Sequence, residues 1–168
     1  MKLKALYPNY YNTIKIKWTP PSSYEKIMEQ AFEKQEDVFF YKILAAYRAH
    51  QPKLIYIGKT YAQYVKVRLK NKDHLLKREN IKKSYPNHTL SISLGKVIEH
   101  NQKTPLNSNF IDKVESLLIY AHANNSHPHL INQKSIWNHN IKRAYHIINA
   151  GFLKDKMEKE IALGVFVK

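Results

Sequence analysis

Two apolar segments separated by a short polar loop place the strongest constraint on the fold. Residues 38–47 and 54–58 are rich in the apolar and aromatic side chains that are typical of strands. They lie close enough to pair antiparallel across the loop at His50-Gln51-Pro52. The second segment, Leu54-Ile55-Tyr56-Ile57-Gly58, ends at a glycine. The sequence therefore predicts an antiparallel pair of strands over residues 38–58.

Hydrophobic periodicity and cap residues predict the elements around this pair. Helices are expected at 22–35 (capped by Ser22 or Ser23), at 61–71, at 74–83 (capped by Asp73) and at 110–124 (capped by Ser108). A third strand is expected at 89–99 and a short one at 162–167. Residues 1–21 are interpreted as an irregular or strand-like arm, and residues 145–152 are left unassigned.

This order of elements predicts an α+β fold with a small three-stranded antiparallel sheet flanked by helices. The 168 residues suffice for a single domain with a core. We expect the core over about 38–133, preceded by an N-terminal arm and helix (1–37) and followed by a C-terminal extension (134–168).

The charge of the chain indicates its class of partner. Lys and Arg number 28 against 13 acids, giving a formal net charge of +15. Such an excess favours a polyanion, most often nucleic acid. The alternative is a basic protein whose charge serves solubility alone.

Composition also excludes several classes of protein. The chain has no cysteine, which rules out disulfides and thiolate zinc sites. Its N-terminus has no apolar signal segment, and no apolar run reaches the roughly 18 residues of a membrane helix. We therefore expect a cytoplasmic protein with no membrane partner. The abundance of Lys, Asn and Ile suggests a bacterial or phage origin.

Four positions outside the general charge carry chemistry that suits phosphodiester hydrolysis. Tyr56-Ile57-Gly58-Lys59-Thr60 is followed by Arg68, by a lone acid, Glu115, in an apolar helix, and by Asn132. Arginine meets phosphate oxygens in a fixed fork, and a carboxylate can hold Mg²⁺. A tyrosine is an unusual base, with a pKa of about 10, unless a cation such as Lys59 lowers that value.

In this order of residues the chain resembles the GIY-YIG nuclease family. Tyr56-Ile57-Gly58 matches the second half of the family's name, and Phe39-Phe40-Tyr41-Lys42-Ile43 stands where the first half is expected, without its glycine. The resemblance implies that Arg68 binds phosphate, that Glu115 binds the metal, and that Asn132, in the loop after Pro128, braces the site.

The resemblance thus implies six catalytic residues and a metal. The catalytic set is Tyr41, Tyr56, Lys59, Arg68, Glu115 and Asn132. The implied cofactor is Mg²⁺, with Mn²⁺ as a substitute, held by Glu115. Tyr41 is favoured narrowly as the general base, with Tyr56 positioning the water or sharing that role.

Each of these residues also has a structural interpretation. Both tyrosines could be sheet aromatics, and Tyr47 lies on the same strand face as Tyr41 and could be the true partner. Arg68 could be a surface side chain, Glu115 a member of a salt bridge, and Asn132 a turn residue. His74 lies six residues after Arg68, whereas some restriction-type members of the family have a histidine four residues after their arginine.

Two further groups of residues attract attention. A basic run is interpreted as a DNA-contacting face or a solvated helix surface, and it comprises Lys70, Lys72, Lys77, Arg78, Lys82 and Lys83. A histidine-rich stretch suggests zinc, although its spacing matches no standard set, and it comprises His122, His127, His129 and His139. Trp137-Asn138-His139-Asn140 is superficially similar to HNH nucleases but lacks their flanking pattern.

The sequence therefore predicts a Mg²⁺-dependent, site-specific endonuclease of the type II restriction kind. Such an enzyme would act on double-stranded DNA, work as a homodimer on palindromic sites and have a methyltransferase as its functional counterpart. One alternative is a structure-specific or homing nuclease. Another is a non-catalytic nucleic-acid-binding protein on the same scaffold, as the missing glycine before Phe40 would allow.

Overall fold

The computed structural model describes residues 11–31, 37–101, 105–123, 129–132 and 144–163. The described strands are β1 (Tyr11–Trp18), β2 (Val38–Ala46), β3 (Lys53–Lys59), β4 (Thr89–His100), β5 (Ala144–Gly151) and β6 (Glu160–Leu163). The described helices are α2 (Tyr24–Glu29), α3 (Val65–Lys70), α4 (Lys72–Ser84) and α5 (Ser108–Ala123). Among these helices none has the length and apolar character needed to cross a membrane.

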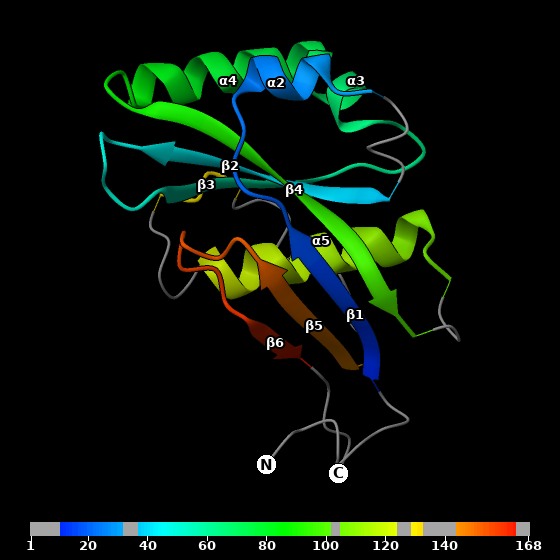
Figure 1. Cartoon of the computed structure of the whole chain (residues 1–168). Coiled ribbons are helices and arrows are strands. Elements are labelled where there is room, and N and C mark those ends of the chain that lie inside the picture. The colour runs from blue at the N-terminus through cyan, green and yellow to red at the C-terminus, as the bar shows by residue number, and fades with distance from the viewer. Residues whose placement is uncertain (1–10, 32–36, 102–104, 124–128, 133–143, 164–168) are drawn as a thin grey trace.

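The strands form one mixed, curled sheet in the order β3-β2-β4-β1-β5-β6 (Figure 1). The α+β class is confirmed, and β3, β2 and β4 pair antiparallel as expected. The prediction of a small three-stranded sheet is wrong, because β1 adds to β4 and β5 runs parallel to β1. Alternation of Ile14, Ile16 and Trp18, each at most 1% exposed, makes residues 11–18 an interior strand. This part of the predicted arm is therefore in the core.

Helices cover the sheet on both faces (Figure 1). On one face α5 packs its apolar stripe, including Ile111, Val114 and Leu118, against β1, β2 and β3. On the other face the short α2 and α3 and the longer α4 cover β2, β3 and β4. The two apolar clusters are separate, and Tyr41 and Tyr56 both belong to the one beneath α3 and α4.

Several helix ends differ from the sequence prediction. Ser23 caps α2 by accepting a hydrogen bond from the Lys26 amide, but the helix ends at Glu29, before the predicted end at 35. The next helix, α3, begins at Val65 because residues 61–63 form bends, with Ala62 at a φ of 55°. The first turn of α5 is capped by Asn107 rather than Ser108, through a 2.9 Å bond from the Phe110 amide to Asn107 Oδ1.

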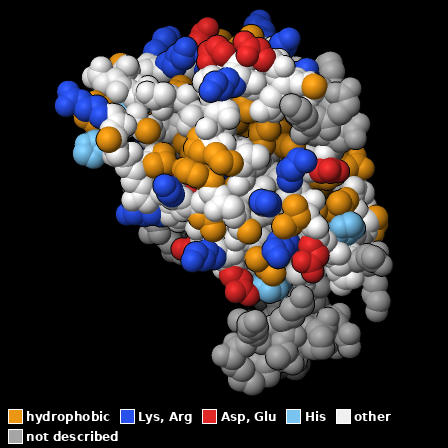
Figure 2. Space-filling view, in the orientation of Figure 1, with side chains coloured by type: hydrophobic (Ala, Val, Ile, Leu, Met, Phe, Trp, Pro, Cys, Tyr) orange, Lys and Arg blue, Asp and Glu red, His pale blue; other side chains and the backbone are white. Residues whose placement is uncertain are grey.

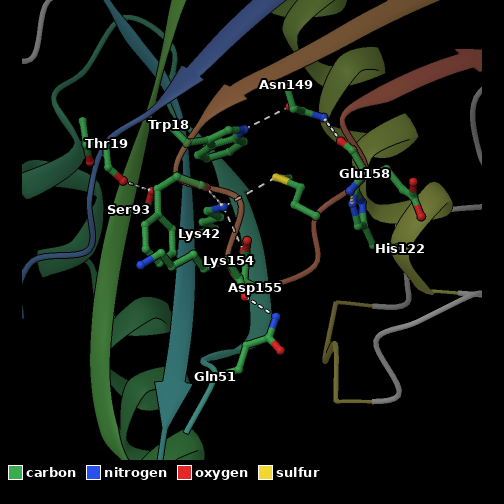
Figure 3. Close-up of polar contacts among 12 residues, drawn as sticks. Trp18, Thr19, Lys42, Gln51, Ser93, His122, Asn149, Lys154, Asp155 and Glu158 are labelled. Atoms are coloured by element: carbon green, nitrogen blue, oxygen red, sulfur yellow. Dashed lines mark hydrogen bonds and ion pairs between the residues drawn. The ribbon is translucent and has the colours of Figure 1, made fainter. Parts of the chain in front are cut away.

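Residues 144–163 join the core through a buried polar network (Figure 3). The Lys42 ammonium lies 2.8 Å from the Asp155 carboxylate, with both side chains fully buried. It also donates to the Phe152 carbonyl at 2.9 Å. Trp18 Nε1 donates to Asn149 Oδ1 at 2.9 Å. The predicted C-terminal extension is thus, in its described part, integral to the sheet, and the strand expected at 162–167 begins at Glu160.

Candidate active site

Two tyrosines from neighbouring strands meet at the edge of the sheet. Tyr41 on β2 is opposite Gly58 on β3, and Ile43 is opposite Tyr56. The register shifts just beyond this pair, between Ile43 and Leu44. Such a bulge re-aims side chains, and bulges are common beside active sites. The two phenol rings lie 5.9 Å apart between centroids, so the expected pairing of Tyr41 with Tyr56 is found.

His74 joins this pair, although the sequence left it in doubt. Tyr41 Oη lies 3.2 Å from His74 Nδ1, and His74 is only 3% exposed. Burial first, and then the charges of Lys77 and Arg68, lower the pKa of His74 to about 4. At neutral pH the ring is therefore uncharged, and its Nδ1 can accept a hydrogen bond from the Tyr41 hydroxyl.

A break between two helices explains the spacing of His74. Residues 65–84 are not one continuous helix, because Asn71 has extended backbone (φ −63°, ψ 145°) and separates α3 from α4. The change of direction at Asn71 removes the simple helical relation between Arg68 and the residues that follow. A histidine six residues on, rather than four, therefore faces Tyr41.

Lys77 lies inside the site rather than on an outer face. Its ammonium donates to Tyr56 Oη at 3.1 Å and lies 4.2 Å from the centre of the Tyr56 ring. It stands about one helical turn after His74 on α4, so the two residues share a face. The sequence placed Lys77 among DNA-contacting lysines, and only the path of α4 over the two tyrosines reveals its position here.

Glu115 reaches the same site from α5, on the other side of the sheet. Burial raises the pKa of its carboxyl to about 7, and the charges of Lys59, Arg68 and Lys77 partly oppose that rise. The carboxylate also accepts a hydrogen bond from the Lys59 backbone amide, which likewise favours the ionised form. Because β3 is the edge strand, α5 and α4 can both direct side chains to its end.

Tyr41 is the most enclosed member of the group. It is 0% exposed, whereas Tyr56 is 7% exposed. Burial, and after it the charge and hydrogen bond of Tyr56, raise the pKa of Tyr41 well above its ordinary value. Arg68 acts in the opposite direction and Glu115 in the same direction. The charges of Arg68 and Glu115 thus both act on the Tyr41 phenol. This is expected if the three side chains belong to one site.

Lys59 and Asn132 hold the end of β3 in place. The Lys59 ammonium pairs with Asp112, which lies on α5 one turn before Glu115. Asn132 brackets Ile57 by donating to its carbonyl and accepting from its amide at 3.4 Å. The Ile131 amide also donates to the Ile55 carbonyl at 2.9 Å. Asn132 therefore braces the strand, whereas the ammonium of Lys59 is directed at an acid.

The basic run on α3 and α4 divides into two groups. Arg78 is tied to α2, with Glu25 Oε1 at 3.3 Å and the Tyr24 ring at 3.7 Å. Four other members of the run are exposed: Lys70, Lys72, Lys82 and Lys83. In the face that Figure 2 shows, basic side chains lie among acidic ones rather than in a single patch. The exposed four remain predicted phosphate contacts.

The chemistry of the donors fits a weakly held divalent ion. Within the described residues no three His, Cys, Asp or Glu side chains are grouped as a metal cage. Glu115 is a single carboxylate beside cations that suit phosphate oxygens. Mg²⁺ is commonly held by one or two carboxylates, waters and substrate phosphates, so the residues present fit this ion.

The zinc interpretation gains no support from the described histidines. His122 Nδ1 lies 2.6 Å from the Leu118 carbonyl, and its Nε2 accepts from the Glu158 amide at 3.0 Å. Both ring nitrogens are thus engaged by backbone groups, in the network of Figure 3. His127, His139 and the HNH-like segment at 137–140 lie outside the described residues.

Comparisons with known proteins found no similar family or structure. No family model, no curated protein and no solved structure matches the chain. The geometry of the site therefore carries the functional argument by itself.

Proposed function

We propose that this protein is a Mg²⁺-dependent endonuclease that hydrolyses DNA phosphodiesters to 5′-phosphate and 3′-hydroxyl ends. One observation carries the proposal. Side chains from two strands and three helices meet at one edge of the sheet, and they comprise Tyr41, Tyr56, Arg68, His74, Lys77 and Glu115. The group combines proton acceptors, phosphate-binding cations and one carboxylate, as hydrolysis of a phosphodiester requires.

The order of exposure assigns the proton transfers. Tyr56 is the phenol nearer to solvent, so it is placed to take the proton of the attacking water. Tyr56 gives its own proton to solvent before it takes that of the water, while Tyr41 keeps its proton and donates a hydrogen bond to Nδ1 of the neutral His74. The buried Tyr41 then never holds a net negative charge, which its raised pKa disfavours. This order gives Tyr56 the role of base that the sequence favoured narrowly for Tyr41.

The cations beside the phenols are placed to stabilise the reacting phosphate. Arg68 and Lys77 both lower the pKa of Glu115, so their positive charges act on the carboxyl that would hold the metal. A guanidinium binds two phosphate oxygens at once, and an ammonium adds a point charge. Lys77 also donates to Tyr56 Oη, so a cation lies against the phenol oxygen that takes part in the proton transfer.

Glu115 is the residue that would hold the metal ion. When bound, Mg²⁺ supplies positive charge for the oxygen that leaves the phosphate. Because burial raises the pKa of Glu115 to about 7, protons compete with the metal for this carboxylate near neutrality. Metal affinity should therefore increase as pH rises through about 7.

The finer part of the proposal concerns the substrate. A restriction-type enzyme would read a short duplex site and act as a homodimer. The structure-specific alternative is favoured by one observation, a row of aromatic and histidine rings in mutual contact beside the turn between β2 and β3. Incubation with plasmid and with branched DNA distinguishes the restriction-type enzyme from the structure-specific nuclease. Discrete plasmid fragments indicate site recognition, whereas cuts confined to branched DNA indicate recognition of structure.

The test of the nuclease proposal compares two carboxylate variants. Unmodified plasmid is incubated with Mg²⁺ and wild-type protein, Glu115→Gln or Glu79→Gln, and the ends are sequenced. Glu79 is an exposed acid on α4 and serves as the matched control. We expect cleavage by wild type and Glu79→Gln only, with 5′-phosphate ends. Equal cleavage by Glu115→Gln, or cleavage without added divalent metal in the presence of EDTA, would contradict the proposal.

A further inference from the structure

A row of five rings lies beside the turn between β2 and β3, at the end of the sheet away from the active site. Consecutive centroids are 5.9, 5.4, 5.1 and 6.1 Å apart, and the rings belong in order to His50, Tyr47, His88, Tyr85 and His129. None of these residues is buried, and His50 is exposed. Tyr85 also packs against the cluster beneath α3 and α4, whereas the other four rings belong to neither core cluster. Rings that stay in mutual contact at the surface suggest a binding function.

The row borders a hollow of about 870 Å³ at the turn between β2 and β3. Four of the five rings line it, together with Lys53 and Lys156, which supply positive charge. Arg48, beside Tyr47 in the turn, adds a third cation, with its guanidinium 5.1 Å from the Tyr47 ring centre. The hollow therefore combines aromatic faces with cations, and the acid in its lining, Asp155, is paired with Lys42.

One ring nitrogen in this row lacks a protein partner. Nδ1 of His88 is buried and has no hydrogen-bond partner among the described residues. Buried polar atoms are nearly always paired, so an orphan indicates that a ligand or water completes it. His88 also lines a second hollow, of about 320 Å³, which reaches His74 of the active site. The two hollows share Pro86 and His88 and are thus neighbours.

We propose that this row of rings binds the unstacked bases of single-stranded DNA. Bases stack on aromatic faces whatever their sequence, while nearby cations attract the backbone phosphates. The enclosed Nδ1 of His88 would bond to a water beside the bound strand. A paired duplex keeps its bases stacked on each other and cannot offer those faces.

The position of the row fits a strand that continues into the active site. Lys53 at one end of β3 lines the hollow, and Lys59 at the other end contacts the Glu115 carboxylate through its amide. Six residue steps along a strand separate them, which is roughly 20 Å. A few unpaired nucleotides next to the cleaved bond would reach the rings. The inference rests on the proposed function for DNA as the polyanion, and it refines the substrate to DNA with an unpaired segment.

Binding without cleavage tests this inference. Full-length Glu115→Gln protein, free of divalent metal, is mixed with a short oligothymidylate that carries one 2-aminopurine, or with the same strand in a full duplex. Anisotropy of an end label gives the affinity, and quenching of 2-aminopurine reports stacking on a ring. Tyr47→Ala and His50→Ala are each added to this protein, with Tyr120→Ala as control because Tyr120 is a 42% exposed tyrosine on α5.

We expect Tyr47→Ala to weaken single-strand binding roughly fivefold or more, with less quenching, and to leave duplex binding unchanged. His50→Ala should act in the same direction, and since His50 is exposed at the turn its loss does not threaten the fold. Tyr120→Ala should behave as the parent. Equal affinities of parent, Tyr47→Ala and His50→Ala for the single strand, or equal losses for strand and duplex, would overturn the inference. Because no cleavage is measured, failure of the nuclease proposal would not produce either result.

Discussion

The phenol ring of Tyr41 lies across the backbone of Gly58, its antiparallel neighbour on β3. A Cβ built on Gly58 would stand 2.5 Å from Tyr41 Oη and 2.7 Å from Tyr56 Cε1. The Gly58 backbone is not in a conformation that requires glycine, since Gly151 is the glycine with positive φ among the described residues. The glycine of the Tyr56-Ile57-Gly58 motif is thus required for space, because two phenols converge above it.

Gly58→Ala should therefore disrupt the active site. The added methyl must displace both phenols, and such overpacking costs about 1–3 kcal/mol of unfolding free energy. Gly95→Ala is a matched control, because its Cβ would stand 2.8 Å from Trp18 in the opposite core cluster. Both variants should lose stability in denaturant titrations. At a temperature where both are folded, only Gly58→Ala should lose cleavage activity. Full activity of folded Gly58→Ala would show that the tyrosines need not meet.

The contact between Tyr41 and His74 predicts that the two phenols and the imidazole act as one unit. Tyr56→Phe, Tyr41→Phe and His74→Gln should each lower kcat by about 10²- to 10⁴-fold, the usual contribution of acid–base catalysis. The double variant Tyr41→Phe/Tyr56→Phe should lose little more than the worse single variant, because Tyr41 acts by positioning Tyr56 and residues that act as a unit are not additive. Single-turnover cleavage measures this. Tyr120→Phe is the control, and multiplied losses in the double variant would show that the two phenols act independently.

The raised pKa of Glu115 predicts an unusual dependence of stability on pH. The folded protein holds this proton up to about pH 7, whereas the unfolded chain releases it near 4.5. Native protein therefore binds more protons between these values, and the contribution of Glu115 to stability falls as pH rises from 4.5 to 7. Without metal, Glu115→Gln should be more stable than wild type at pH 8 by about 1–3 kcal/mol. Near pH 4 the difference should largely disappear.

The contribution of His74 to stability changes with pH in the opposite direction, over a pH range that overlaps that of Glu115. Its folded pKa of about 4 is below the ordinary value of 6.5, so the unfolded chain binds the proton first. Stability from His74 is present above pH 6.5 and is lost as pH falls towards 4. Urea titrations of wild type and Glu115→Gln from pH 4 to 8 separate the two contributions. Parallel curves for the two proteins would contradict the burial of Glu115 as an acid.

Addition of Mg²⁺ gives a further check on Glu115. A ligand that binds only the folded state raises the melting temperature with its concentration. We expect Mg²⁺ to stabilise wild type at pH 8 and to leave Glu115→Gln unchanged, with a smaller effect on wild type at pH 6. Differential scanning calorimetry measures the shift, and Glu79→Gln should respond as wild type does. Equal shifts in all three proteins would place metal binding elsewhere.

The sequence predicted the parts of the fold that depend on local patterns. The strands around Tyr41 and Tyr56 follow from short apolar runs and a nearby turn, and α5 follows from its apolar stripe. The parallel pairing of β1 with β5 did not follow. Asn149 interrupts the apolar pattern of β5 yet is buried, because Trp18 donates to it and it donates to the Glu158 carbonyl. Only partners distant in sequence make that polar residue compatible with a core.

The candidate site was predictable to a similar extent. The order and spacing of Tyr56, Arg68 and Glu115 predict a site from the sequence alone. His74 and Lys77 depend on the break at Asn71, where neither glycine nor proline signals the end of α3. The pairing of Lys59 with Asp112 depends on the seating of α5 against β3. Tertiary packing, rather than local propensity, determines where the side chains of His74, Lys77 and Lys59 lie.

The buried pair of Lys42 and Asp155 should be the most sensitive polar contact of the core. Lys42 Nζ lies between the Trp18 and Phe152 rings, at 4.8 and 5.6 Å from their centres, and burial lowers the pKa of Lys42. Asp155→Asn or Lys42→Met leaves one charge buried without its partner, at a cost of about 3–5 kcal/mol. The double variant Lys42→Met/Asp155→Leu should cost much less than the sum, since it removes both charges.

A double-mutant cycle by urea unfolding measures the coupling between these two residues. The exposed pair of Lys15 and Glu99, 4.0 Å apart, is the control, and its coupling should be under about 1 kcal/mol. Cleavage activity of the folded double variant should persist, because Lys42 points to the face of the sheet opposite Tyr41. Additive losses at Lys42 and Asp155 would mean that water screens the pair and that this ion pair contributes little to holding residues 144–163.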